Sequence, residues 1–165
     1  MRKLLSTGIV FLGIAGAPGG EVRNVGVSED AKGQCTYDPR LSTLKQFFRE
    51  MGSPAEVYCH DFIRASDQNN MDWRLLPSIA FVESGGGKQP CGNNWFGWDN
   101  GRTDFTSVPH GIRLVADRLS NSTLYKEKDL DQVLRIYNPN GDYPQLVRSV
   151  MRRISATTTH PLRVN

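Results

Sequence analysis

The chain has few of the residues that build disulfide scaffolds and metal sites. Its 165 residues include only three cysteines, Cys35, Cys59 and Cys91. At most one internal disulfide can therefore form, one thiol is left over, and the sequence does not choose the pair. The three histidines are too scattered to give, with these cysteines, the spacing of zinc ligands. We therefore expect no metal ion and no other cofactor.

A membrane-spanning run is also missing from the start of the chain. The apolar run over residues 4–17 follows Met1-Arg2-Lys3, ends on small residues and is too short to cross a bilayer comfortably. A positive start, a short apolar core and a small-residue end are typical of a secretory signal peptide. We predict that residues 1–17 are removed on export, which leaves a secreted, periplasmic or cell-envelope protein without a stable membrane span. A retained anchor is the alternative.

Excess charge is scarce as well. The formal net charge is +3, and loss of Arg2 and Lys3 with the signal peptide lowers it to +1, because all acidic residues lie beyond that segment. A nearly neutral chain lacks the basic surface that follows nucleic-acid phosphates or holds a protein on an anionic membrane. We therefore expect no nucleic-acid partner.

The rest of the chain is long enough for one domain with its own core. Residues 18–34 are rich in glycine and charge and are predicted to be a flexible leader, residues 35–154 the domain, and residues 155–165 a flexible tail. Between residues 93 and 107, aromatic residues flank an Asp-Asn-Gly turn signal, which is typical of a small β-hairpin. The predicted fold class is mostly α with that one hairpin. Apolar residues recur at helical spacing over residues 41–51, 53–66, 75–84, 109–119, 130–137 and 143–154.

Glu83 ends the most apolar of these helical segments. Leu76, Ile79, Ala80 and Glu83 follow the spacing of one inward-facing stripe, so the acid points where a methyl group is usual. The negative end of the helix and an apolar wall both disfavour the ionised carboxylate, so its pKa should be raised. Such a group suits general acid catalysis near neutral pH. The alternative is a helix-end glutamate with its head in solvent.

Several motifs follow Glu83 in a recognisable order. The chain reads Glu-Ser-Gly-Gly-Gly-Lys at 83–88, Asn-Asn-Trp-Phe-Gly-Trp at 93–98, Phe-Thr-Ser at 105–107 and Leu-Tyr-Lys at 124–126. This order resembles that of the endo-β-N-acetylglucosaminidases (mannosyl-glycoprotein endo-β-N-acetylglucosaminidase-like) that cut bacterial peptidoglycan and belong to the lysozyme-like superfamily. The resemblance covers about residues 72–154. It implies a lysozyme-like α domain in which Glu83 is the catalytic acid.

A second resemblance lies near the C-terminus. Tyr137-Asn138 is similar to the Tyr-Asn pair of the soluble lytic transglycosylases, relatives with the same fold. The Tyr137 hydroxyl can hold an N-acetyl group or stabilise the transition state, or it can be a core hydroxyl with one satisfied hydrogen bond. Asn138 is either a sugar contact or a cap before the following proline.

Glycoside hydrolysis usually needs a second group besides the acid. Asp99 and Asp104, in the expected hairpin, are the candidates, although turn aspartates commonly cap local backbone. If neither lies near Glu83, the substrate acetamido group or a tyrosine-held water can serve instead.

Substrate contacts are predicted around the aromatic segment. Trp95 or Trp98, but not both, should stack on sugar rings, because neighbours in a strand alternate between faces. Asn94 is expected to fix a backbone or sugar amide, and Ser84 is a further substrate-binding candidate. The glycines at 85–87 either supply positive φ and keep space open for a polymer, or form a flexible helix cap.

The sequence therefore predicts an exported, monomeric peptidoglycan hydrolase that cleaves β-1,4 bonds of N-acetylglucosamine-containing glycan strands. Two alternatives stay open. A lytic transglycosylase would use Glu83 first as acid and then as base, and would give anhydro-muramic products. A non-catalytic wall-binding module would keep the fold without turnover.

Overall fold

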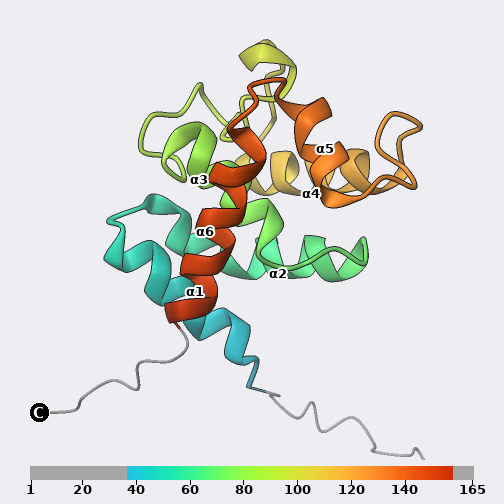
Figure 1. Cartoon of the computed structure of the whole chain (residues 1–165). Helices are drawn as coiled ribbons and strands as arrows, with labels where there is room; N and C mark the ends of the chain where they lie inside the picture. Colours follow the sequence, from blue (N-terminus) through green and yellow to red (C-terminus); the bar gives the residue numbers. More distant parts are fainter. Residues whose placement is uncertain (1–36, 158–165) are drawn as a thin grey trace, which may run out of the picture. The chain divides into compact units, whose positions relative to one another are not determined.

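The computed structural model describes residues 37–157, and the prediction of a mostly α fold is confirmed for this part of the chain. It contains six α-helices and two 3-10 helices (Figure 1). The predicted signal peptide, the predicted leader, Cys35 and residues 158–165 lie outside the described residues. The elements are α1 (Pro39–Glu50), η1 (Pro54–Tyr58), α2 (Cys59–Gln68), α3 (Leu75–Ser84), η2 (Trp98–Gly101), α4 (Val108–Asn121), α5 (Leu130–Tyr137) and α6 (Tyr143–Thr157).

Local sequence signals explain where four of these helices begin. The side chains of Asp38, Ser53, Ser107 and Asp129 each accept a hydrogen bond from a backbone N–H in the first turn that follows. Asp129 forms a full capping box with Gln132, and α1, η1 and α4 each carry proline in the first turn. Such caps contribute about 1 kcal/mol each and make the helix starts readable from sequence.

Helix α3 lies at the centre of the packing. Leu76, Ile79 and Ala80 are fully buried, so the predicted apolar stripe is confirmed. Helix α6 packs on α3, α1 and α5, while α2 packs on α1, α3 and α4 (Figure 1). The last turn of α3 emerges at the edge of this core, which places Glu83 beside the segment that joins α3 to α4.

The predicted β-hairpin over residues 93–107 is wrong. No strand occurs in the described part of the chain, and its one β-bridge joins Cys91 to Asn94. Asp99 and Asn100 have φ of 53°, as left-handed residues, and Gly97 and Gly101 are also left-handed. Because a strand needs extended backbone, this segment closes into η2 instead. The alternation argument for Trp95 and Trp98 therefore does not apply.

Two element boundaries also differ from expectation. Residues 53–66, predicted as one helix, form η1 followed by α2. Helix α6 continues to Thr157, so the first residues of the predicted tail are helical, and Ser155 accepts a hydrogen bond from Arg74 at 2.7 Å. No helix within residues 37–157 is long and apolar enough to cross a membrane.

Candidate active site

The Glu83 carboxyl stands at the edge of the core. The residue is partly exposed, but its Oε1 atom is buried and makes no hydrogen bond of standard geometry. Burial raises the pKa of Glu83 above its ordinary value, whereas the facing Tyr143 hydroxyl and Asn138 side chain lower it by less. The predicted direction is confirmed, with desolvation as the main cause. A carboxyl group of this kind keeps its proton to higher pH than a surface glutamate does.

A groove of about 700 Å³ adjoins Glu83. Its walls come from the end of α3, from the η2 segment, from the chain after α4 and from the end of α5. This size lies within the range of small-molecule sites in proteins. The residues that line it include Glu83, Gly97, Trp98, Tyr125, Tyr137 and Asn138.

Gly97 forms part of the groove wall beside the acid. A Cβ atom built on Gly97 would lie 2.9 Å from Glu83 Oε2, and its φ is +59°. Both the contact and the conformation therefore require glycine. The sequence analysis gave Gly97 no role in the site. Its position inside the motif Asn-Asn-Trp-Phe-Gly-Trp was the one feature that could have pointed to such a role.

The three glycines after Glu83 form a packed turn. Gly85 ends α3 in the left-handed conformation, and Cβ atoms built on Gly86 and Gly87 would lie 2.3 Å from Ser53 Oγ and 2.6 Å from the Trp95 ring. The prediction of positive φ is confirmed. The expectation that the triplet keeps space open for a polymer is wrong, because these glycines meet protein atoms and do not line the groove.

Two stacked tyrosines lie behind the acid. The rings of Tyr137 and Tyr143 are 5.9 Å apart and nearly parallel. Tyr137 donates its hydroxyl hydrogen to the Phe96 carbonyl, as expected for a core tyrosine with one satisfied hydrogen bond. The residue also lines the groove. Tyr143 is only 3% exposed, its hydroxyl has no hydrogen-bond partner of standard geometry, and it faces Glu83.

Sequence reasoning missed Tyr143. It starts α6 and occupies an apolar position of that helix, so periodicity alone makes it a core residue. Its contact with Glu83 joins residues 60 positions apart in the chain, and no local pattern carries that information.

Trp98 and Asn138 both reach the groove. The Trp98 ring is 5.8 Å from the Tyr137 ring and 6.4 Å from the Tyr125 ring, so three aromatic side chains meet at this wall. Asn138 faces Glu83 and also accepts a hydrogen bond from the Asn140 N–H at 3.0 Å. Asn138 therefore makes the bond of a local cap and also lines the groove, where its expected sugar contact stays a prediction.

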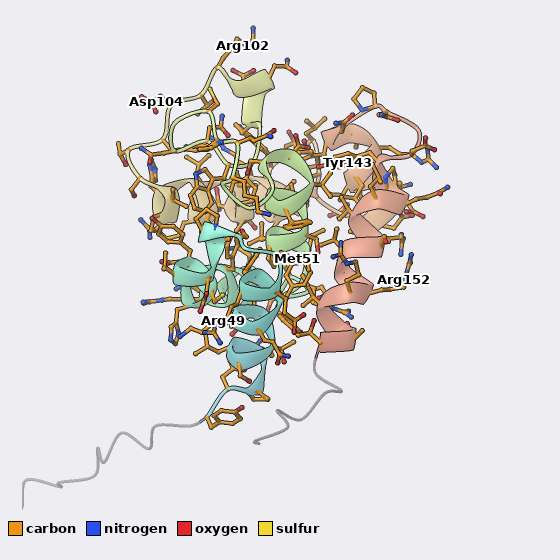
Figure 2. The ribbon with its side chains drawn as sticks, turned by 90° about the vertical axis from the view of Figure 1, so that its left-hand side faces the viewer. Arg49, Met51, Arg102, Asp104, Tyr143 and Arg152 are labelled. Atoms are coloured by element: carbon orange, nitrogen blue, oxygen red, sulfur yellow. The ribbon has the colours of Figure 1, made fainter. Side chains whose placement is uncertain are left out.

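The two aspartate candidates lie in different places. Asp99 lines the groove, but its half-exposed carboxylate pairs with Arg102 at 2.7 Å. Asp104 is exposed and does not line the groove, and Figure 2 shows it at the outer edge of the molecule, away from Tyr143. Asp104 therefore follows the groove residue Thr103 in the chain without lining the groove itself.

The remaining predicted contacts, Ser84, Asn94 and Trp95, are buried away from the groove. The Ser84 hydroxyl donates to the Ala80 and Trp95 carbonyls and accepts from the Gly87 N–H. Asn94 accepts a hydrogen bond from the Trp98 N–H and donates to the Trp98 and Thr103 carbonyls. Of the two expected roles, it therefore has the one of fixing backbone groups. These hydrogen bonds occupy the polar atoms of both side chains.

Trp95 packs edge-on against Tyr58, with ring centres 5.2 Å apart, and covers Gly87. Of the two tryptophans, Trp98 is therefore the one in the groove. As expected, only one of these two tryptophans lines the groove. The cause is the 3-10 helix η2 and not the alternation of side chains along a strand.

No group of three or more metal-binding side chains occurs within residues 37–157. Cys59 is buried and Cys91 is exposed, and these two are not joined to each other. Burial raises the pKa of the Cys59 thiol to about 12, which makes it unreactive at neutral pH.

Comparisons of the chain with protein-family models, with known proteins and with solved structures found no match. The function must therefore be argued from the groove, its acid and the motifs around them.

Proposed function

We propose that the protein is an exported glycoside hydrolase and that Glu83 is its general acid. The observation that carries this proposal is the partly buried Glu83 carboxyl, with its raised pKa, beside a groove of about 700 Å³. Breaking a glycosidic bond needs a proton for the leaving oxygen. A carboxyl group that stays protonated near neutral pH can supply it.

The proposed substrate is bacterial cell-wall glycan that contains N-acetylglucosamine in β-1,4 linkage. Sugar rings present apolar faces of C–H groups, and Trp98, Tyr125 and Tyr137 offer aromatic surfaces in the groove. The Asn138 amide, beside the acid, suits a polar substituent such as an acetamido group. The choice of cell wall over other glycans comes from the resemblance of the motifs at 83–88, 93–98 and 124–126 to peptidoglycan-cutting glucosaminidases.

The test is the release of soluble fragments from purified peptidoglycan. Glu83→Gln removes the acid and keeps the shape, so we expect release to fall by about 10³-fold or more while the thermal unfolding midpoint stays within a few degrees. A folded Glu83→Gln protein that releases fragments as fast as the parent would refute the proposal. Binding of the parent to insoluble wall without any release would instead favour the wall-binding module.

A lytic transglycosylase is the second candidate, and the pairing of Asp99 favours it. Of the acids that line the groove, Glu83 is the one without an ion pair, since Asp99 is held by Arg102. A transglycosylase needs one carboxyl group, which protonates the leaving oxygen and then accepts the proton of the muramic C6 hydroxyl as that hydroxyl attacks the anomeric carbon. No second carboxylate and no attacking water are then required.

Mass spectrometry of the released fragments decides between the two. Anhydro-muramic ends, lighter by one water, identify the transglycosylase. Reducing N-acetylglucosamine ends identify the glucosaminidase. Asp99→Asn is the companion variant, because a hydrolase that uses Asp99 loses most of its activity, whereas a one-carboxyl transglycosylase keeps it.

A further inference from the structure

A second cleft adjoins the groove. Its volume is about 390 Å³, and it lies between the turn after α2 and the chain that joins α4 to α5. Tyr125 lines both the cleft and the groove, so this one side chain is a shared wall. Figure 1 shows the connection between α4 and α5 (orange) on the same side as the turn between α2 and α3 (green).

Non-glycine residues with positive φ line both the groove and the cleft. Within residues 37–157, the non-glycine residues with positive φ are Asn70, Asp99, Asn100 and Glu127. Asp99 and Asn100 line the groove, and Asn70 and Glu127 line the cleft. Such conformations cost free energy and cluster where a site needs a particular shape. Glu127 is the clearest case, because glutamate lacks the tolerance of asparagine and aspartate for this region.

The cleft has an aliphatic floor and a charged rim. Leu75, Leu119 and Val133 are buried beneath it, and Lys128 and Glu127 are exposed beside it. Flat aromatic platforms, which suit sugar rings, are limited here to the shared Tyr125. The floor therefore fits small aliphatic side chains, and the adjacent opposite charges fit a ligand that carries both carboxylate and amine groups.

We propose that this cleft binds the peptide branch of the cell-wall polymer. The inference rests on the proposed function, because a cell-wall glycan strand in the groove carries peptides on its lactyl groups, and these peptides branch off the strand. A cleft that shares a wall with the groove lies where such a branch can go. These peptides contain alanine methyl groups, free carboxylates and an amine, which match the floor and the rim.

The experiment uses the full chain with Glu83→Gln, so that no probe is cut. One probe is a free stem peptide of alternating L and D residues with a terminal D-alanine, and the other is an N-acetylglucosamine tetramer without peptide. Methyl NMR follows Leu119 and Val133 in the cleft and Leu124 in the groove. We expect the peptide to shift the cleft methyl signals and the tetramer to shift the groove signal.

Charge reversal supplies the matched pair of variants. Lys128→Glu should weaken peptide affinity about fivefold, the size expected for an exposed charge contact and its reversal. Lys126→Glu, equally exposed in the same connection but outside the cleft, should leave it unchanged. Neither variant should change affinity for the tetramer.

The outcomes separate this inference from the proposed function. A peptide that leaves the cleft signals unmoved, or that is weakened equally by both lysine variants, overturns the inference. The function still stands in that case if the parent releases fragments from intact wall. Conversely, peptide binding in the cleft with no fragment release by the parent supports the inference and refutes the hydrolase.

Discussion

At the scale of single residues, the site depends on how closely Gly97 approaches the acid. A side chain there would meet Glu83 Oε2 at 2.9 Å, in a backbone region that glycine alone adopts freely. At this position the acid therefore has the Gly97 backbone beside it, while the Tyr143 and Asn138 side chains face it from α6 and from the end of α5.

Gly97→Ala should abolish most of the activity. We expect fragment release to fall by about 100-fold, because the methyl group displaces the carboxyl, and unfolding free energy to fall by about 1–2 kcal/mol from the forced φ. Gly52→Ala is the matched control, since Gly52 has φ of +57° but open space around its Cβ position. Equal losses of activity in both variants would show that backbone strain, and not contact with Glu83, is responsible.

Tyr143→Phe should change the pH profile of the reaction. The Tyr143 hydroxyl lowers the pKa of Glu83, so its removal raises that pKa further. A general acid must be protonated to act, so the alkaline limb of the kcat/KM profile should move to higher pH. Because the buried hydroxyl makes no hydrogen bond of standard geometry, its removal should cost little stability. An unchanged alkaline limb would contradict the contact between these two groups.

Glu83 should also make stability depend on pH. Its folded pKa is raised, so the native state binds the proton more tightly than the unfolded chain does. The stabilisation is complete below the unfolded pKa and is lost as pH rises through the folded pKa. The parent should therefore lose stability relative to Glu83→Gln as pH increases across that window, as measured by urea unfolding at several pH values. A constant difference would show that the carboxyl is solvated.

At the scale of elements, the segment between α3 and α4 shapes the groove without regular strands. In strands, backbone groups would pair with each other. Here the Asn94 side chain bonds the Trp98 N–H and two carbonyls instead, and so folds the chain into η2. A buried side chain that satisfies three backbone groups acts as part of the backbone framework.

Asn94→Ala should therefore be costly. Three backbone groups lose their partner, so we expect a loss of about 2–4 kcal/mol in unfolding free energy, together with lower activity as Trp98 shifts. Asn93→Ala is the control, because Asn93 makes a single such bond, to the Phe105 carbonyl, and should lose about 1 kcal/mol. Denaturant titration measures both, and similar values for the two would contradict the assigned role of Asn94.

The elements that sequence predicted well are those with local causes. Helix α5 was predicted over its observed bounds because apolar residues recur through it, and in the structure Asp129 caps its start. The hairpin failed because a turn signal and aromatic residues do not reveal that one buried asparagine will hold the chain in a tighter shape. Glu83 was found because its position breaks a local apolar stripe. Tyr143 was not, because its partner is distant in the chain.

At the scale of the whole molecule, the low net charge, +3 for the full chain, and the groove are compatible with the proposed enzyme for an uncharged sugar backbone. The proposal includes export, and the prediction of export rests on the sequence of residues 1–17. Expression of the full chain in a bacterial host should yield a processed protein in the envelope or medium whose N-terminus lies near Pro18. A protein of full mass retained in the membrane fraction would indicate an anchor instead.

The Ser84 hydroxyl bonds backbone groups inside the protein and so affects how far the site can adjust its shape. It joins the last turn of α3, which carries Glu83, to the Trp95 carbonyl and to the Gly87 N–H. These bonds fix the last turn of α3 against the segment that leads to Gly97 and Trp98 in the groove wall. If the protein acts on glycan as proposed, room for acetylated or otherwise decorated sugars would come from the wall after α4, where Leu124 is 56% exposed.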